Sequence, residues 1–474
     1  MGASLRYVST RQSGDTGTRS FEDILLEGIA PDGGLYVPVE IPNLSHDEIR
    51  RWRGADYASV AAAVLERFAG GTLTRSELDA LTQSAYRGFD HPAVAPLKQI
   101  GRDEWLLELF HGPTLAFKDY ALQVLGRLFD KVLARRRERI TIIGATSGDT
   151  GSAAIEACRD RDMLDVFILY PDGRTSEVQR RQMTTVASEN VHTLAIDGSF
   201  DDCQDLVKAM FADAPFRSRL GLASVNSINW ARITAQIAYY FVAATALGAP
   251  DRPVSFAVPT GNFGNVYAGH VARAMGLPVR SLVIGTNRND ILWRFIASGD
   301  MSLRPVEPSL SPSMDIQVSS NFERLYHEVL GRDGAATAAA MTAFRRDGRL
   351  PANEKAWQRA RLLFEAHRLD DEGIEATIAD VFHETGEIID PHSAVAVAAM
   401  RAQPGEAGVP RVALACAHPA KFPEAVERIT GYRPVLPPHL EDLMERQETI
   451  NRLPNDLDAV RRFVASRARR GAAQ

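Results

Sequence analysis

The hydrophobic and polar positions of residues 1–98 repeat mainly with helical spacing. Residues 21–38 (FEDILLEGIAPDGGLYVP) predict a short helix that closes in Gly and Pro turns, and residues 57–70 and 76–86 predict two amphipathic helices. Runs that alternate apolar and polar residues, as strands do, are few in this part of the chain. The pattern therefore predicts a mostly helical N-terminal domain over residues 1–98.

From residue 99 the pattern changes to short apolar, β-branched runs separated by helical segments. These runs lie at 139–145, 165–173, 190–197, 255–260 and 281–287. Strands that alternate with helices form parallel sheets with helices on both faces, so the predicted fold class is α/β. Between about 309 and 350 helices and turns replace the strands, and RVALACAHPA (411–420) reads as one last buried strand.

Two α/β domains are expected in this region, because 474 residues are too many for one hydrophobic core. The smaller one covers residues 99–220 and contains Lys118 and a TSGDTG loop. The larger one covers residues 221–474 and contains a GNFGN loop and the C-terminal helices. An apolar stretch at 233–248 includes Gln236 and predicts a buried helix, since it is too short to cross a bilayer.

Lys118 is out of place in the pattern of residues 110–130 (FHGPTLAFKDYALQVLGRLFD). Apolar residues of the following helix share one face: Leu122, Leu125, Phe129, Val132 and Leu133. Helical steps of four, seven and eleven put Lys118 on that inward face, at the N-terminus of the helix, where burial and the dipole both favour a neutral amine. A neutral lysine is a nucleophile that forms Schiff bases. The alternative is a lysine that extends to solvent, which is the commoner case for helical lysines.

Two glycine-rich loops each follow a strand and precede a helix. GATSGDTGSAA (144–154) and PTGNFGN (259–265) allow close approach of the backbone, and a helix N-terminus offers free N–H groups to an anion. An ordinary capped turn is the alternative for the first loop. Neither has dinucleotide or ATP-loop spacing. Two anion sites and one inward lysine suit pyridoxal 5'-phosphate acting on a substrate that carries a carboxylate.

Composition and other motifs exclude several classes of function. The formal net charge of −6 argues against a nucleic-acid binder. The start of the chain lacks the apolar core of a secretory signal, and three scattered cysteines form neither a disulfide framework nor a metal site. His383, Glu384 and His392 lack zinc spacing and read as surface or capping residues. We expect a cytoplasmic protein with no metal that binds neither nucleic acid nor membrane.

Five motifs in order resemble the threonine synthase family, in its long enterobacterial and fungal branch. They are FHGPTLAFKDY (110–120), ATSGDTG (145–151), NSIN (226–229), PTGNFGN (259–265) and AHPAKF (417–422). The resemblance implies a fold-type-II pyridoxal-phosphate enzyme, a carbon–oxygen lyase acting on phosphates. Its reaction would convert O-phospho-L-homoserine and water to L-threonine and phosphate, by γ-elimination and β-addition of water. The resemblance to this branch of the family implies that the protein is a monomer, although a dimer is also possible.

The resemblance also implies roles for cofactor-binding residues. Lys118 would hold the cofactor as a Schiff base, and four residues would line its phosphate mainly through backbone N–H groups: Gly261, Asn262, Phe263 and Asn265. Many members of the family carry Asp where this chain has Asn265. Cys416 stands where Thr is common and would face the pyridine nitrogen; like a hydroxyl, a thiol need not keep that nitrogen protonated.

The expected substrate-binding residues come from two motifs. The TSGDTG loop would hold the substrate carboxylate through Thr146, Ser147 and Thr150, with Asp149 near the ring hydroxyl or a proton relay. Asn229 and Arg232 are the expected ligands of the leaving phosphate, and the further candidates are Asn226, His111 and Lys421. Two alternatives stay open: another fold-type-II lyase, such as a threonine or serine dehydratase, and a non-catalytic ligand-binding relative.

Overall fold

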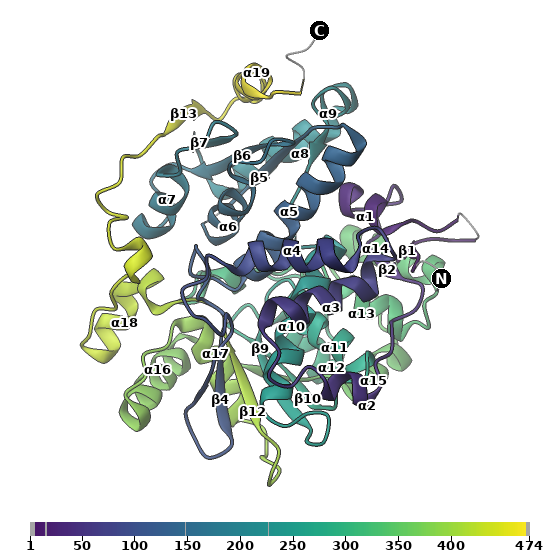
Figure 1. Cartoon of the computed structure of the whole chain (residues 1–474), viewed down its shortest axis with the longest axis vertical. Coiled ribbons are helices and arrows are strands. Elements are labelled where there is room, and N and C mark those ends of the chain that lie inside the picture. The colour runs from purple at the N-terminus through teal and green to yellow at the C-terminus, as the bar shows by residue number, and fades with distance from the viewer. Residues whose placement is uncertain (1–4, 15–16, 147, 226, 471–474) are drawn as a thin grey trace.

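The computed structural model describes residues 5–14, 17–146, 148–225 and 227–470. A five-stranded parallel sheet forms the upper body in Figure 1, in the order β13-β7-β6-β5-β8. Its strands are β5 (Ile140–Ala145), β6 (Leu164–Pro171), β7 (Val191–Asp197), β8 (Leu222–Ala223) and β13 (Asn451–Pro454). Its strands β5, β6 and β7 arise from the apolar runs of the sequence, as predicted.

A six-stranded sheet forms the lower body, in the order β11-β10-β9-β12-β4-β3, and it is parallel except for the β3–β4 pair. Its strands are β3 (Leu97–Gln99), β4 (Glu104–Glu108), β9 (Val254–Pro259), β10 (Val279–Thr286), β11 (Glu365–Arg368) and β12 (Arg411–Ala415). A separate antiparallel pair joins β1 (Tyr7–Ser9) to β2 (Tyr36–Pro38).

Helices cover both faces of each sheet, because the buried strands are apolar on both sides. In β6, Phe167 and Leu169 pack with the helices of one face, whereas Val166 and Ile168 belong to the core on the other. The helices of this body are α5 (Lys118–Arg136), α6 (Asp149–Cys158), α7 (Glu177–Thr184), α8 (Phe200–Ala212), α9 (Ala214–Leu220) and α19 (Leu457–Arg467). The α/β fold class is confirmed.

The larger sheet has the same two-sided packing. Its helices include α10 (Trp230–Ala246) and α11 (Gly264–Ala274) on one face, and α16 (Asp371–Thr385) and α17 (Pro391–Arg401) on the other. The remaining helices of this body are α12 (Ile291–Ser298), α13 (Phe322–Val329), α14 (Gly334–Asp347), α15 (Glu354–Leu363) and α18 (Pro423–Thr430).

The N-terminal region is mostly helical, as its periodicity predicts. Its helices are α1 (Phe21–Glu27), α2 (His46–Arg50), α3 (Tyr57–Ala69) and α4 (Arg75–Tyr86). Ser20 and Thr74 begin α1 and α4 with capping boxes, in which the side chain accepts the N–H three residues on and an acidic residue there reaches back.

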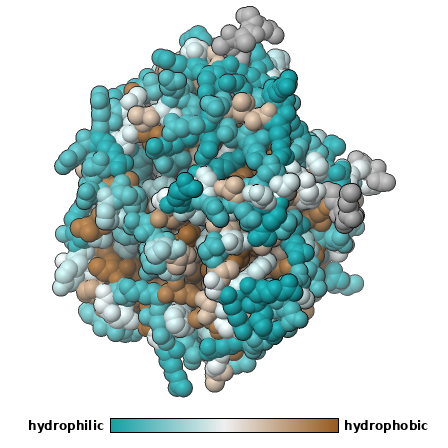
Figure 2. All heavy atoms as spheres, in the orientation of Figure 1, coloured by the Kyte–Doolittle hydropathy of each residue, from teal (hydrophilic) through white to brown (hydrophobic). Residues whose placement is uncertain are grey.

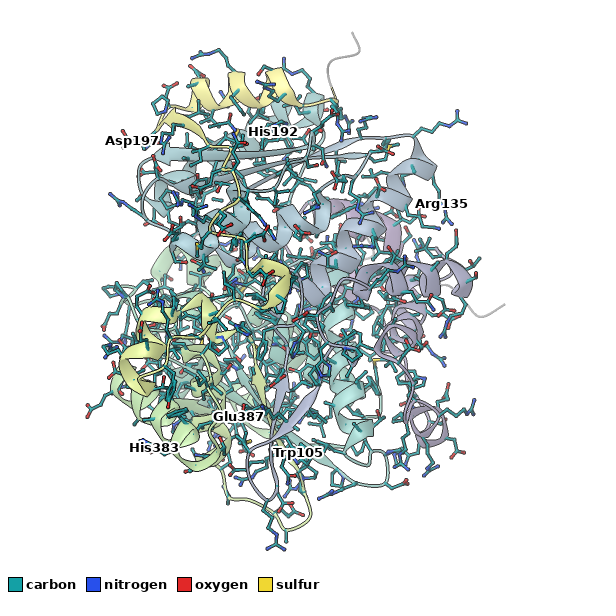
Figure 3. All side chains as sticks on the ribbon, turned by 60° about the vertical axis from the view of Figure 1, so that its left-hand side comes forward. Trp105, Arg135, His192, Asp197, His383 and Glu387 are labelled. Atoms are coloured by element: carbon teal, nitrogen blue, oxygen red, sulfur yellow. The ribbon has the colours of Figure 1, made fainter. Side chains whose placement is uncertain are left out.

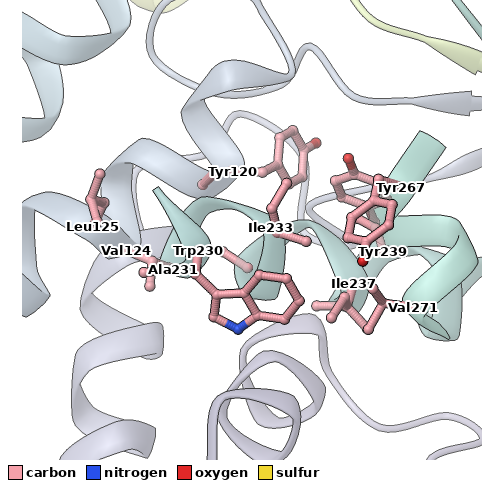
Figure 4. Packing of buried hydrophobic residues seen from close by; sticks show 14 of the residues in the cluster. Tyr120, Val124, Leu125, Trp230, Ala231, Ile233, Ile237, Tyr239, Tyr267 and Val271 are labelled. Carbon is pink, nitrogen blue, oxygen red and sulfur yellow. The ribbon is translucent and has the colours of Figure 1, made fainter. Parts of the chain in front are cut away.

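Helix α10 joins the bodies through the main core. Trp230, Ile233 and Ile237 of α10 lie among Val124 of α5 and Val271 of α11 (Figure 4). The predicted buried helix is therefore confirmed, and its apolar surface fixes the start of α5 relative to the start of α11.

The chain crosses between the sheets more often than the expected boundaries at 98/99 and 220/221 allow. Strand β4 lies in the larger sheet, although it precedes the smaller one in sequence, and β13 returns to the smaller sheet from the C-terminal region. Figure 3 shows this separation: Trp105 marks β4 in the lower body, and His192 and Asp197 mark β7 in the upper one. The boundaries therefore do not separate the two sheets, because strand pairing joins distant segments.

The predicted apolar runs correspond to β5, β6, β7, β9, β10 and β12, and the remaining strands were not predicted. Strand β11 reads Glu-Ala-His-Arg and β13 reads Asn-Arg-Leu-Pro, so neither shows an apolar run. Both lie at sheet edges, where polar residues and proline are tolerated. The buried strand expected within 411–420 is confirmed as β12, and the strand that follows it, β13, is partly exposed.

The face seen in Figure 2 is largely hydrophilic, with apolar residues gathered over the region of α16, α17 and α18. No helix among the described residues has the length and apolar character needed to cross a membrane.

Candidate active site

Lys118 is the first residue of α5 and lies beside the end of β12. The loop before it is joined to the segment after β12 by two backbone hydrogen bonds: Phe117 N–H donates to the Cys416 carbonyl (2.9 Å) and His418 N–H to the Leu115 carbonyl (3.0 Å). These bonds fix the start of α5 against the carboxyl end of the larger sheet. In parallel α/β sheets this end is where ligands bind.

The Lys118 side chain points inward, as helical spacing predicts, and is 13% exposed. Its Nζ lies 3.3 Å from Asp149 Oδ2. Burial lowers the pKa of Lys118, and the positive charges of Lys421 and Arg232 lower it further, against the opposing effect of Asp149. The ammonium form is therefore disfavoured relative to an ordinary lysine.

Asp149 is the first residue of α6 and accepts hydrogen bonds from three further side chains. Lys421 Nζ lies 2.7 Å and Gln179 Nε2 2.9 Å from its Oδ1, and Ser313 Oγ lies 3.0 Å from its Oδ2. Burial alone would raise the pKa of Asp149, but the adjacent ammonium groups of Lys421 and Lys118 hold it well below its usual range. Asp149 is thus a carboxylate that links both bodies.

The TSGDTG loop is shaped by its own hydrogen bonds. The Thr146 hydroxyl accepts from Gly148 N–H (3.0 Å) and from Gly151 N–H (2.9 Å). Gly148 has φ of 151°, and a Cβ there would lie 2.4 Å from the Gln179 side chain, so only glycine fits. Thr150 is half-buried in the first turn of α6. Ser147, expected to bind the substrate carboxylate, lies outside the described residues, as does Asn226.

The backbone N–H groups of the GNFGN loop point away from the segment that contains Ser319 and Asn321. The Gly261 carbonyl accepts from Ser319 Oγ (2.7 Å), and the Asn262 carbonyl accepts from the N–H and Nδ2 of Asn321 (3.1 and 3.0 Å). In a trans peptide the C=O and the following N–H point in opposite directions, so the N–H groups of Asn262 and Phe263 face the other side. There they adjoin the free N–H groups of the first turn of α11, which together suit an anion.

Asn265 and Cys416, both expected at the cofactor, are in contact: Asn265 Nδ2 lies 3.7 Å from Cys416 Sγ. Asn265 Oδ1 accepts from the hydroxyls of Tyr239 (2.6 Å) and Tyr240 (2.9 Å). Its amide is therefore tied into the core, which leaves its backbone N–H for a phosphate. Burial raises the pKa of the Cys416 thiol well above its usual value, so this group is a neutral hydrogen-bond partner.

Arg232 and Asn229 lie at the start of α10 and differ in how their polar atoms are used. Arg232 is 3% exposed and donates to the Val225 carbonyl (2.8 Å), but its Nε has no partner, and among the described residues no carboxylate pairs with it. Burial lowers its pKa to about 10. Asn229 caps the helix by accepting from Ala231 N–H (3.0 Å) and donates to the Leu25 carbonyl (2.9 Å). Only Arg232 therefore retains an unsatisfied donor.

Several residues near Asp149 were missed or misjudged from the sequence. His392 was read as a surface or capping residue, which is wrong: it is 3% exposed, its Nε2 accepts from Ser313 N–H (3.2 Å), and its Nδ1 lies 2.7 Å from Asp390. Ser313 lies in a turn-rich segment whose sequence pattern did not indicate a functional residue. By contrast His383 and Glu384 are exposed as predicted, and Figure 3 shows His383 at the edge of the lower body. His111, a further candidate, pairs with Glu108 (2.8 Å).

Asp119 gives the first turn of α5 a pH-dependent stability. Its buried carboxylate accepts from the N–H (2.8 Å) and the hydroxyl (2.7 Å) of Thr114, and burial raises its pKa from 3.8 to about 7. The folded state therefore binds this proton more tightly than the unfolded chain, so the stabilisation is complete below about pH 4 and is lost as the pH rises to about 7.

Asp119→Asn removes this titration. We expect the melting temperature of the variant, relative to the parent, to rise between about pH 4 and about pH 7 and to level off above that range. Thermal denaturation across this range measures the difference. A difference that stays constant with pH would contradict the assigned pKa.

These groups fit a ligand with an aldehyde and a phosphate. Lys118 supplies an amine of lowered pKa, the GNFGN loop supplies amides, and Cys416 supplies a neutral partner for a ring nitrogen. Arg232 supplies an unpaired cation for a second anion.

Comparisons with known proteins agree with this arrangement. Three family profiles match successive parts of the chain: Threonine synthase N terminus (6–86), Pyridoxal-phosphate dependent enzyme (90–353) and Threonine synthase, C-terminal (393–464). The threonine synthase of Pseudomonas aeruginosa is 53% identical over 468 residues, covering 98% of this chain and 99% of the relative. The chain belongs to the threonine synthase family.

Solved structures of the threonine synthase family share the whole fold. The pyridoxal-phosphate-bound threonine synthase from Brucella melitensis matches with a TM-score of 0.96 at 52% identity, covering 98% of this chain and 100% of that one. The yeast threonine synthase matches with a TM-score of 0.94 at 38% identity, and the match covers 98% of this chain and 99% of the yeast chain. The resemblance seen in the sequence motifs is thus confirmed, and so are the fold-type-II fold and pyridoxal phosphate as the cofactor.

Proposed function

We propose that this chain converts O-phospho-L-homoserine and water to L-threonine and phosphate, as a carbon–oxygen lyase acting on phosphates. The observation that carries the proposal is the junction at the start of α5. There an inward lysine of lowered pKa lies beside Cys416, whose side chain contacts the GNFGN loop. Membership of the threonine synthase family supports the same reaction.

Pyridoxal phosphate, when bound, supplies the electron sink that makes the substrate Cα–H and Cβ–H bonds acidic. Lys118 holds the cofactor and, once its amine is freed, takes the Cα proton and later a Cβ proton at Nζ. Its burial excludes water, and its lowered pKa keeps the amine free to accept a proton. Cys416 would serve as a neutral hydrogen-bond partner for the pyridine nitrogen, because burial raises the pKa of its thiol.

The substrate's two anionic groups require separate binding sites. The N-terminus of α6, with Thr146, Ser147 and Thr150, holds the carboxylate through backbone amides and hydroxyls, which keeps the Cα–H bond aligned for proton removal. The substrate phosphate binds Arg232. Asn229, expected beside it, has both ends of its amide engaged within the fold, so the assignment rests on the unpaired Nε of Arg232.

The purified protein should release phosphate from O-phospho-L-homoserine and no ammonia from serine or threonine. Separate assays of the three compounds distinguish this function from that of a dehydratase, which would release ammonia from the hydroxyamino acids. The absorption spectrum of the purified protein distinguishes the proposed enzyme from a non-catalytic relative. We expect an absorption band near the visible edge that disappears on borohydride treatment; a colourless protein, or phosphate release no faster than in buffer, would contradict the proposal.

The expected monomer and the expected cytoplasmic location stay predictions that rest on the resemblance and on composition.

A further inference from the structure

Lys421 is a second buried lysine at the same carboxylate. It ends a short 3-10 turn, Pro419–Lys421, that follows β12, and its side chain is 0% exposed. Its Nζ lies 2.7 Å from Asp149 Oδ1, 2.8 Å from the Thr114 carbonyl and 3.3 Å from Gln182 Oε1. An ammonium has three donors, and here three acceptors surround it. A buried ammonium requires such partners, and the three acceptors around Lys421 match the three donors of an ammonium group.

Asp149 therefore lies between two lysines with unequal surroundings. Lys421 approaches Oδ1 at 2.7 Å with two further acceptors, whereas Lys118 reaches Oδ2 at the longer distance of 3.3 Å. One carboxylate cannot fully compensate two buried ammonium groups in a dry site. The lysine with the poorer set of acceptors is the one whose ammonium form is less stabilised, and that lysine is Lys118.

We propose that Lys421 is a positioning residue. It forms an ion pair with Asp149, so that this carboxylate stabilises the ammonium form of Lys118 less and leaves the Lys118 amine unprotonated and reactive. It acts through Asp149 and touches neither cofactor nor substrate in this role. Its bond to the Thr114 carbonyl also ties the turn before α5 to Asp149 of α6. The inference rests on the proposed function of Lys118, and its test separates the two.

Other charged or titratable groups surround the two lysines. Arg232 of α10 is a cation that also lowers the pKa of Lys118, after burial, Asp149 and Lys421. Asp119 of α5 interacts electrostatically with Lys421 and Cys416 after β12 with Lys118, whereas Asp390 before α17 acts on Cys416. The thiol stays neutral, and neither Asp119 nor Asp390 hydrogen-bonds to Lys118, so Asp149 remains the anion that both lysines share.

Trapping of the cofactor as a function of pH tests the inference. The full-length chain is equilibrated with pyridoxal phosphate between about pH 6 and 10, reduced with borohydride, and digested, and the label on the Lys118 peptide is quantified by mass spectrometry. Trapping rises with pH as the amine loses its proton. In Lys421→Met we expect the midpoint to move up by about one pH unit, which corresponds to about tenfold less label at a fixed pH below it, because a neighbouring cation is gone and Asp149 pairs with Lys118 alone.

Two further variants separate this effect from a structural one. Lys421→Arg keeps the charge and should return the midpoint to that of the parent, and Lys208→Met, at an exposed lysine paired with Asp205, should not move it. A merely structural role would lower the label at every pH and leave the midpoint unchanged. If Lys421→Met does not fold, as judged by circular dichroism, Lys421→Gln takes its place against Lys421→Arg.

The outcomes are distinct. An unchanged midpoint in folded Lys421→Met or Lys421→Gln overturns the inference, as does a midpoint in folded Lys421→Arg that shifts as far as in the methionine variant. A failure of all three Lys421 variants to fold, with Lys208→Met folded, also overturns it, because the residue is then required for the fold itself. If the parent traps no cofactor at Lys118 at any pH, the proposed function fails rather than the role of Lys421.

Discussion

Lys118→Ala should abolish threonine formation, with turnover reduced by about 10⁴-fold or more. The amine is proposed both to hold the cofactor and to carry the protons at Cα and Cβ, and loss of a general base alone costs about 10²- to 10⁴-fold. Phosphate release from O-phospho-L-homoserine measures the rate. Borohydride reduction followed by peptide mapping measures the covalent bond, which should be absent from the variant.

The control is Lys208→Ala, since that exposed lysine pairs only with Asp205 on α8. It should retain both activity and the trapped cofactor. Steady-state threonine formation by Lys118→Ala, or cofactor trapped on another lysine of the parent, would refute the assignment of Lys118.

Local periodicity predicts the elements that carry the site. The inward direction of Lys118 follows from its steps to Leu122, Leu125 and Phe129, all of which are buried. Each Gly-rich loop lies between a strand and a helix as its sequence indicates, because the apolar runs before them become central strands β5 and β9. These predictions succeed because each depends on residues within about ten positions of one another.

Contacts between distant segments could not be predicted in this way. Ser313 reaches Asp149 across 164 positions, and His392 supports Ser313 across 79. Nothing in a turn-rich segment indicates which carboxylate it will meet. The same reason applies to β13, which pairs with β7 across more than 250 positions of chain.

The role of Asn229 could not be predicted from the sequence for a different reason. Its place directly before a buried helix indicates both a cap and a ligand, and the sequence cannot separate them. In the structure its side-chain oxygen caps α10 and its side-chain Nδ2 donates to the Leu25 carbonyl of α1, a partner that only the tertiary fold supplies. Arg232 lies close by at the start of the same helix but keeps an unpaired donor, which makes it the better candidate ligand of the substrate phosphate.

Arg232→Met should raise the KM for O-phospho-L-homoserine about 100-fold while the cofactor content stays unchanged. A buried guanidinium without a carboxylate partner can form a charge-assisted bond to a substrate phosphate, and loss of one such bond costs about 2 to 5 kcal/mol. Tenfold in affinity corresponds to about 1.4 kcal/mol, so a 100-fold change lies within that range. Steady-state kinetics and the absorbance of the bound cofactor measure the two quantities separately.

The thermal stability of this variant should stay equal to that of the parent or rise, because an unpaired buried cation is replaced by an apolar side chain of similar length. Arg324 supplies the matched contrast. It is equally buried, and burial lowers its pKa to about 10, but it donates to the carbonyls of Tyr36 (3.0 Å) and Ile228 (2.6 Å) and to the Asn321 side chain.

Arg324→Met should therefore lower the melting temperature, since it leaves several buried acceptors without donors. The two arginines differ in whether their donors are used within the fold, and that difference should decide which variant loses stability and which loses substrate affinity. If Arg232→Met loses stability as Arg324→Met does, or loses cofactor and substrate affinity equally, Arg232 is a structural residue and the substrate phosphate must bind elsewhere.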